Sequence, residues 1–129
     1  MRYFAKLAGS DLYGCNVAQS AEVDQWIDLA FTELFEVLFN YLGPMTGGPF
    51  PVTKEAYDKA TRNLRNWSKI ISAHLELRSF LVGNTLTAAD VCVASILSII
   101  FSLGIDSRFA KNYTHLTRWL KHVTSSPVW

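Results

Sequence analysis

The sequence has little charge, and it has no long uninterrupted apolar run. Charged residues make up 18% of the 129 residues and the formal net charge is +1. That balance is typical of neither a disordered chain nor a strongly basic nucleic-acid binder. The most apolar run, from Val91 to Ile105, contains three serines and is shorter than the about 20 residues that a membrane-spanning helix needs. The chain start lacks the apolar stretch of a signal peptide. We therefore expect no membrane attachment and no nucleic-acid partner.

Cysteine is also scarce, since Cys15 and Cys92 are the only two. A pair so far apart in the sequence is neither a disulfide framework nor a zinc-binding pattern. Cys92 lies in the apolar run and is expected to be a buried small hydrophobe, whereas Cys15 lies beside a glycine and can be exposed. Both fit a reducing compartment, so we expect a cytoplasmic protein.

Half of the residues are apolar, which suffices to bury the core of one domain. Their spacing has the helical period, and Gly, Pro and capping residues divide the chain into segments. We expect two long antiparallel helices, a helix apolar nearly all round buried beside them, short helices before and after these, and no sheet. The expected ranges are 2–8, 20–42, 53–77, 88–103, 107–111 and 114–124. The fold prediction is thus an all-α bundle of about five or six helices.

Local signals set the expected ends of these helices. Ser20 is expected to cap the first long helix and Thr53 the second. Gly43-Pro44 is expected to end the first one. A second apolar edge on that helix, Phe31, Phe35, Phe39 and Leu42, has two interpretations. We favour a helix at the centre of the bundle, and the alternative is a packing surface for another domain or subunit.

Thr87 and Asp90 have the three-residue spacing of a capping box. The Thr87 hydroxyl can accept a hydrogen bond from the amide of residue 90, and the carboxylate can reach back to the amide of residue 87. A structural capping role explains Asp90 without any catalytic role.

The remaining polar residues indicate no catalytic chemistry. No carboxylate forms a convincing acid–base pair with a neighbouring histidine. His115 and His122 are about two helical turns apart and cannot share a metal, and His74 is interpreted as a packing histidine. We expect no catalytic, cofactor-binding or metal-binding residues. A basic stripe is interpreted as a solvated face rather than a phosphate contact; its members are Arg108, Lys111, His115, Arg118 and His122.

Three motifs carry a family resemblance. The segment 80–90, Phe-Leu-Val-Gly followed by Leu-Thr-Ala-Ala-Asp, resembles the motif before the buried helix of glutathione-transferase C-terminal domains. Arg118-Trp119 followed by Pro127 resembles the closing helix of the same superfamily, and the helix near Val23 resembles its first. The resemblance implies a domain over residues 10–129. Residues 1–9 resemble the remnant of the last helix of a thioredoxin-like half that is otherwise absent.

The absent half carries the thiol-activating residue of the transferases, so the resemblance implies that this chain alone is not an enzyme. Within the superfamily, the segment from His74 to Thr87 is most similar to the gamma-subunit family of eukaryotic translation elongation factor 1. The resemblance therefore implies a non-catalytic interaction or scaffold domain with protein partners in an elongation or synthetase complex; a homodimer is also open. The alternatives are the C-terminal half of a genuine transferase and an appendage of an aminoacyl-tRNA synthetase complex.

In such assemblies the helix with the Arg-Trp pair takes part in contacts between domains. The resemblance, together with the helical spacing, gives the two residues different roles. Trp119 lies one turn from Leu116 and Val123 and is expected to anchor the helix in the core. Arg118 lies on another face with His115 and His122, and Arg118 and His115 are the candidate interface residues. A solvated Arg118, or one in an internal ion pair, is the alternative.

Overall fold

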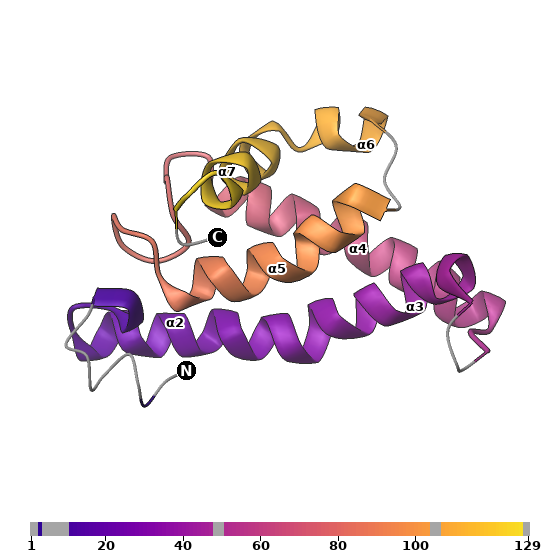
Figure 1. Cartoon of the computed structure of the whole chain (residues 1–129), viewed down its shortest axis with the longest axis horizontal. Helices are drawn as coiled ribbons and strands as arrows, with labels where there is room; N and C mark the ends of the chain where they lie inside the picture. Colours follow the sequence, from indigo (N-terminus) through magenta and orange to yellow (C-terminus); the bar gives the residue numbers. More distant parts are fainter. Residues whose placement is uncertain (1–2, 4–10, 48–50, 104–106, 128–129) are drawn as a thin grey trace.

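The computed structural model describes residues 3, 11–47, 51–103 and 107–127, and these contain helices and no strand (Figure 1). The predicted helical bundle is confirmed. The elements beyond residue 10 are the 3-10 turn η1 (Asp11–Tyr13), α2 (Val17–Leu29), the π-helical turn η2 (Ala30–Leu34), α3 (Phe35–Thr46), α4 (Lys54–His74), α5 (Ala88–Leu103), α6 (Ser107–Asn112) and α7 (Thr114–Thr124). Among the described residues, no helix is long and apolar enough to cross a membrane.

The helices form layers around α5 (Figure 1). α2, η2 and α3 follow one another as a single long helix along one edge of the molecule. α4 packs on α3 and runs back in roughly the opposite direction, and α7 packs on both α4 and α5. As a result α5 lies between the long helix and the closing helix, which is the central position that its apolar sequence predicts.

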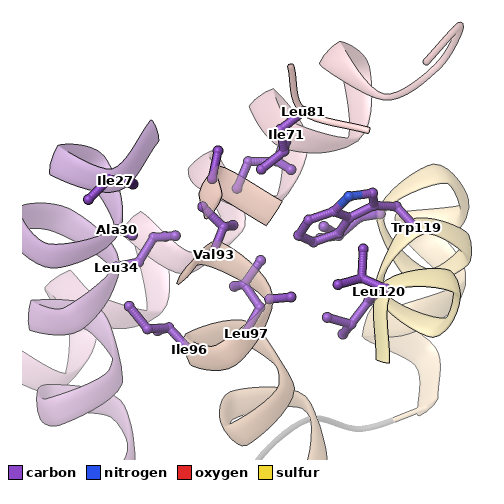
Figure 2. Packing of buried hydrophobic residues seen from close by; sticks show 14 of the residues in the cluster. Ile27, Ala30, Leu34, Ile71, Leu81, Val93, Ile96, Leu97, Trp119 and Leu120 are labelled. Carbon is purple, nitrogen blue, oxygen red and sulfur yellow. The ribbon is translucent and has the colours of Figure 1, made fainter. Parts of the chain in front are cut away.

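The core is built around the apolar side chains of α5 (Figure 2). Val93 and Leu97 are fully buried there. Leu34 reaches this core from the long helix, and Trp119 and Leu120 reach it from α7 on the opposite side (Figure 2). The interdigitated side chains leave α5 with almost no solvent-facing surface at its start, so the position of the α5 start determines how the other helices can pack.

Helix starts follow side-chain capping, but one cap differs from the prediction. Thr53 caps α4 as predicted, because its hydroxyl accepts from the Ala56 amide at 3.2 Å. Ser20 does not cap the first long helix. That helix begins one turn earlier, where the side-chain oxygen of Asn16 accepts from the Gln19 amide at 2.9 Å. Asn is an equally good cap, and the Ser20 hydroxyl instead donates to the Tyr13 carbonyl.

The predicted end of the long helix at Gly43-Pro44 is also wrong. α3 continues through Pro44 to Thr46 and ends at Gly47, which has the left-handed conformation (φ 62°). Pro44 lies in the last turns, so the helix loses few hydrogen bonds by containing it. Gly47 adopts a positive φ without the steric penalty of a side chain, and its amide bonds back to the Gly43 carbonyl.

The long helix contains a π turn that the sequence does not predict. At η2 the Phe35 amide bonds to the Ala30 carbonyl, five residues back. A turn closed in this way holds more residues than an α-helical turn, so side chains four apart lie more nearly above one another. Phe31 and Phe35 are four apart in this region, and both are exposed on the outer side.

The ends of the chain match the predictions where they can be compared. α6 and α7 lie where the two short C-terminal helices are predicted, and α7 is followed by a turn at Ser125 and Ser126. Tyr3 is helical, whereas the rest of the predicted segment 2–8, and the predicted α5 terminator Gly104, lie outside the described residues. The assignment of residues 1–9 to a preceding domain therefore stays a prediction.

Candidate interaction site at the closing helix

Asp90, in the first turn of α5, is the centre of a buried hydrogen-bond network. Its side chain is 0% exposed. Oδ2 accepts from the backbone amide of Thr87 at 3.0 Å and from the Thr87 hydroxyl at 2.9 Å. Oδ1 accepts from the Leu81 amide and from Nε1 of Trp119, both at 2.9 Å. Four donors therefore surround one carboxylate, which is the arrangement that a buried charge requires.

This geometry contains one of the two bonds expected from the spacing of Thr87 and Asp90 and adds three others. The carboxylate reaches back to the Thr87 amide. The Thr87 hydroxyl, predicted to accept from the amide of residue 90, instead donates to the carboxylate. The contacts to Leu81 and Trp119 join the loop before α5 and the closing helix to the same group. We propose that Asp90 stabilises the junction of three segments in addition to capping one helix.

Trp119 lies on the inward face of α7, 1% exposed, within the hydrophobic core (Figure 2). Its indole therefore combines a large buried apolar surface with a satisfied N–H donor. No sequence signal pairs Trp119 with Asp90, because the two are 29 residues apart.

Arg118, the neighbouring residue, is exposed, and its guanidinium is held by hydrogen bonds. One terminal nitrogen, Nη2, donates to the Leu75 carbonyl at 2.7 Å and to the Arg78 carbonyl at 3.2 Å. These carbonyls lie just after α4, at the negative end of its dipole, which favours a cation. The guanidinium therefore ties α7 to the end of α4 along one of its edges. Guanidinium carries five N–H donors, so others are left for a further contact.

A hollow of about 180 Å³ lies beside Arg118. It is lined by Ser79, Arg118, Trp119 and His122. The His122 ring also lies 5.5 Å from the Phe80 ring and borders a second hollow, of about 210 Å³, with Leu86, Val123 and Pro127 among its lining residues. His115, the other predicted interface residue, is half-buried and lines neither hollow. Arg118 and His122 therefore line a common hollow that His115 does not line.

His74 sits at the end of α4 among packing partners. Its ring lies 5.0 Å from the Trp26 ring. Nε2 is 2.8 Å from the Leu81 carbonyl and 3.1 Å from Nη1 of Arg78. A carbonyl needs a donor, so Nε2 carries the proton and its contact with Arg78 is not a hydrogen bond. This environment agrees with a packing histidine.

The other chemically notable group is the Cys15 thiol, which is exposed. The negative charge of Asp11 raises the pKa of this thiol above its usual value; a small desolvation effect and a hydrogen bond to Asp11 act in the same direction. A raised pKa lowers the thiolate fraction at neutral pH, so this cysteine lacks the activated state of a nucleophile. Among the residues that the structure describes, no three His, Cys, Asp or Glu side chains gather as a metal site would require.

The fold has a buried α5 with an aspartate in its first turn. A long first helix and a closing helix with an Arg-Trp pair enclose α5, and this arrangement defines a class of helical domain. Residues 26–127 match the family model described as "Glutathione S-transferase, C-terminal domain". The chain belongs to this family.

Among known proteins, the chain is similar to elongation factor 1-gamma sequences. It is 27% identical over 127 residues to probable elongation factor 1-gamma 1 of Arabidopsis thaliana, covering 98% of this chain and 30% of the relative. It is also 27% identical over 121 residues to elongation factor 1-gamma of Carassius auratus, covering 94% of this chain and 27% of that protein. The chain thus spans less than a third of the length of these relatives.

Two solved structures show the same fold. Poplar glutathione transferase F1 superposes with a TM-score of 0.83 at 19% identity, over 99% of this chain and 62% of the transferase. The glutathione S-transferase-like domain of elongation factor 1-gamma from Saccharomyces cerevisiae superposes with a TM-score of 0.76 at 24% identity, over 84% of this chain and 49% of that chain. The chain therefore has the fold of a part of each of these two solved chains, covering 62% of the first and 49% of the second.

Proposed function

We propose that this chain is a non-catalytic protein-interaction domain of the translation elongation machinery, acting in the cytoplasm as the corresponding domain of an elongation factor 1 gamma subunit. The observation that carries the proposal is the similarity to elongation factor 1-gamma sequences along nearly the whole chain. This sequence similarity supports an association with translation elongation. The scaffold role is an additional part of the proposal.

The docking residues proposed on the closing helix are Arg118 and its neighbours. Two carbonyls hold one edge of the guanidinium, so its orientation is fixed before a partner arrives. Fixing a long side chain in advance lowers the entropy lost on binding. The hollow beside it is lined by Ser79 and His122, which are polar and can hydrogen-bond. A carboxylate from a protein partner suits this site, because guanidinium binds carboxylates through paired N–H groups. His115 stays a candidate at the edge of this surface.

The experiment is capture of partners from a cytosolic extract on the immobilised full chain. Titration then follows with whichever purified elongation factor is retained. Arg118→Ala should weaken that affinity by at least about tenfold, or about 1.4 kcal/mol. Arg118→Lys can still donate to the Leu75 carbonyl but lacks the planar fork, so it should weaken binding in the same direction.

A matched control is Lys121→Ala, which removes an exposed cation of the same helix outside the hollow. It should leave the affinity unchanged. Equal binding by Arg118→Ala, Arg118→Lys and the parent would remove Arg118 from the docking site. If the parent retains no translation protein, the proposed function itself is lost.

The second candidate function is the helical half of a genuine glutathione transferase. Its support is the structural likeness to poplar glutathione transferase F1, which at 19% identity concerns the fold. A longer parent chain with a thioredoxin-like half and a thiol-activating residue would favour this candidate. A synthetase-associated appendage would instead be accompanied by a synthetase catalytic domain, so the complete reading frame separates all three.

A further inference from the structure

Positive charge is concentrated in two segments of the chain. Residues 59–75, which form most of α4, contain four Lys or Arg and no Asp or Glu, and the same is true of residues 107–129. By contrast, residues 7–53 contain six carboxylates and no Lys, Arg or His. The formal net charge of +1 is therefore the sum of one acidic part and two basic parts. A surface with charge of one sign attracts a partner of the opposite sign.

The two basic segments lie side by side in the structure, because α7 packs on α4. At one end of this contact the Tyr113 hydroxyl donates to the Arg65 carbonyl at 3.4 Å. At the other end Nη2 of Arg118 donates to the Leu75 carbonyl at 2.7 Å. The residue numbers of both helices increase from the first contact to the second, so α4 and α7 run in the same direction along a common seam.

Three exposed cations follow this seam and are called here the basic seam. Arg65 and Lys69 are one helical turn apart on α4, and both are exposed, as is Arg118 on α7. An α-helix rises about 1.5 Å per residue, so Lys69 lies about 6 Å beyond Arg65 along α4. Leu75, whose carbonyl holds Arg118, lies about 15 Å beyond Arg65 by the same measure.

No carboxylate neutralises the basic seam among the residues that the structure describes. Arg118 donates to two carbonyl groups, which carry no net charge. The ion pair between Lys59 and Glu36 lies on the edge of α4 that faces α3. Asp58 precedes the seam and Glu76 lies at its far end, and within the described ranges neither pairs with it. The three positive charges are therefore available to a partner.

The spacing of these cations fits an extended acidic segment. In an extended chain the rise is about 3.3 Å per residue and side chains alternate between two faces, so those two positions apart lie about 7 Å apart on one face. Carboxylates at three alternate positions would extend over about 7 and 13 Å, close to the about 6 and 15 Å of the basic seam. Guanidinium and ammonium groups on long side chains can adjust to the remaining difference.

We propose that the basic seam of Arg65, Lys69 and Arg118 binds an extended acidic segment of a partner protein, with carboxylates at alternate positions. The inference rests on the proposed function, because the carboxylate proposed at Arg118 becomes one of a row. A nucleic acid fits less well. Three phosphate contacts release few counterions. The aromatic residues that adjoin the seam, Tyr113 and Trp119, are half-buried and buried, so they offer bases little surface for stacking.

The test measures binding of the full chain to a short fluorescent peptide with glutamate at every second position and serine between. A matched peptide has glutamine in place of glutamate. Fluorescence anisotropy at low salt should show the glutamate peptide binding at least about tenfold more tightly, or by about 1.4 kcal/mol. Its affinity should fall as salt is added, because salt screens exposed charges. Equal binding of the two peptides overturns the proposal.

Two pairs of substitutions locate the peptide on the chain. Arg65→Gln combined with Lys69→Gln removes two charges of the basic seam and should weaken the glutamate peptide by at least about tenfold. The matched control, Lys54→Gln combined with Lys59→Gln, removes the same charge from exposed positions of α4 outside the seam. Glutamine favours helix about as well as Arg and Lys, so circular dichroism should show the parent fold for both. Equal weakening by the two pairs would mean attraction through net charge alone and overturns the basic seam.

A single-stranded RNA oligonucleotide of the same charge as the glutamate peptide is the second probe. It should bind more weakly than the peptide. Tighter binding of the RNA that is lost in the Arg65 and Lys69 variant overturns the proposal, because a nucleic acid would then be the occupant.

Titration with the retained elongation factor separates this inference from the proposed function. If Arg118→Ala weakens that factor and the Arg65 and Lys69 variant does not, the basic seam falls and the proposed function stands. If the chain retains no elongation factor from extract but binds the glutamate peptide through the basic seam, the seam stands and the proposed function falls.

Discussion

The indole N–H of Trp119 donates to the carboxylate of Asp90 over 2.9 Å, inside the core. The bond joins α7 to the first turn of α5, although the two residues are 29 positions apart in the sequence. The family's aspartate motif and its Arg-Trp helix therefore meet in one hydrogen bond. Predictions about stability follow from this contact.

Replacing Asp90 with alanine should be strongly destabilising. The change leaves the buried amides of Leu81 and Thr87 and the Trp119 indole without their acceptor. Each buried unsatisfied donor costs about 1–3 kcal/mol, so we expect the free energy of unfolding to fall by about 3 kcal/mol or more. Urea denaturation measures it. Asp58→Ala, at an exposed position of α4, should change stability by less than about 0.5 kcal/mol. A loss of only about 1 kcal/mol for Asp90→Ala would mean that Asp90 stabilises the domain through helix capping alone.

Replacing Trp119 with phenylalanine should cost about 2 kcal/mol, because a buried donor to a charged acceptor is lost and the smaller ring leaves space. The energetic link to Asp90 is measured by a double-mutant cycle with Asp90→Asn. Since the two side chains bond directly, the single losses should fail to add by at least about 0.5 kcal/mol. Additive losses would show that this hydrogen bond contributes nothing beyond packing.

Replacing Ser68 should increase the stability of the domain. It is 0% exposed on α4, and its hydroxyl has no hydrogen-bond partner within the part of the chain that the structure describes. A buried hydroxyl without a partner carries a desolvation cost, and alanine favours helix more than serine does. Ser68→Ala should therefore raise the free energy of unfolding by about 0.5–1 kcal/mol in urea denaturation. Ser95→Ala is the comparison, because the Ser95 hydroxyl donates to the Val91 carbonyl at 2.6 Å. A destabilised Ser68→Ala would contradict the prediction.

The Cys15 thiol should react slowly with alkylating reagents near neutral pH. Its pKa is raised, first by the negative charge of Asp11, and only the thiolate reacts. Asp11→Asn removes this charge, so the pKa should fall toward its ordinary value and the alkylation rate at pH 7 should increase. The pH–rate profile is measured in a Cys92→Ala background, so that Cys15 is the one remaining thiol. An unchanged profile would show that Asp11 does not act on the thiol.

The purified chain should not conjugate glutathione to a standard electrophile above the uncatalysed rate. The chain corresponds to the C-terminal domain of its family. Its exposed Cys15 thiol has a raised pKa, whereas an activated thiol has a lowered one. The measurement is a spectrophotometric conjugation assay with a full-length transferase as positive control. Turnover that persists through further purification and scales with the amount of this chain would refute the prediction.

The sequence predicts well those features that depend on neighbours in the chain. The apolar period gives the α5 range, and the three-residue spacing of Thr87 and Asp90 gives their backbone contact. Helix ends were harder, because more than one residue can cap a helix. Asn16 precedes Ser20 by one turn and is as good a cap, so α2 starts there.

The features that the sequence does not predict depend on tertiary contacts. One partner of the Asp90 carboxylate, Trp119, belongs to another helix. Arg118 was expected on a face with His115 and His122, either pointing outward to a partner or solvent or closing an internal ion pair. It bonds to carbonyls near the end of α4, more than 40 residues away in the case of Leu75. The helical period relates residues within one helix, so it cannot predict contacts between residues so far apart in the sequence. The π turn at η2 likewise has no sequence signature that would distinguish it from an ordinary α-helical turn.

The long separation between Asp90 and Trp119 also bears on how the domain forms during synthesis. The ribosome releases Asp90 and the apolar residues of α5 well before it releases Trp119, since chains grow at about 5–20 residues per second. In that interval the nascent chain contains the apolar helix α5 but lacks α7, the helix that packs on one side of it. Until the closing helix is made, this apolar surface stays open to chaperones and proteases, so the synthesis of α7 sets the time at which α5 is covered.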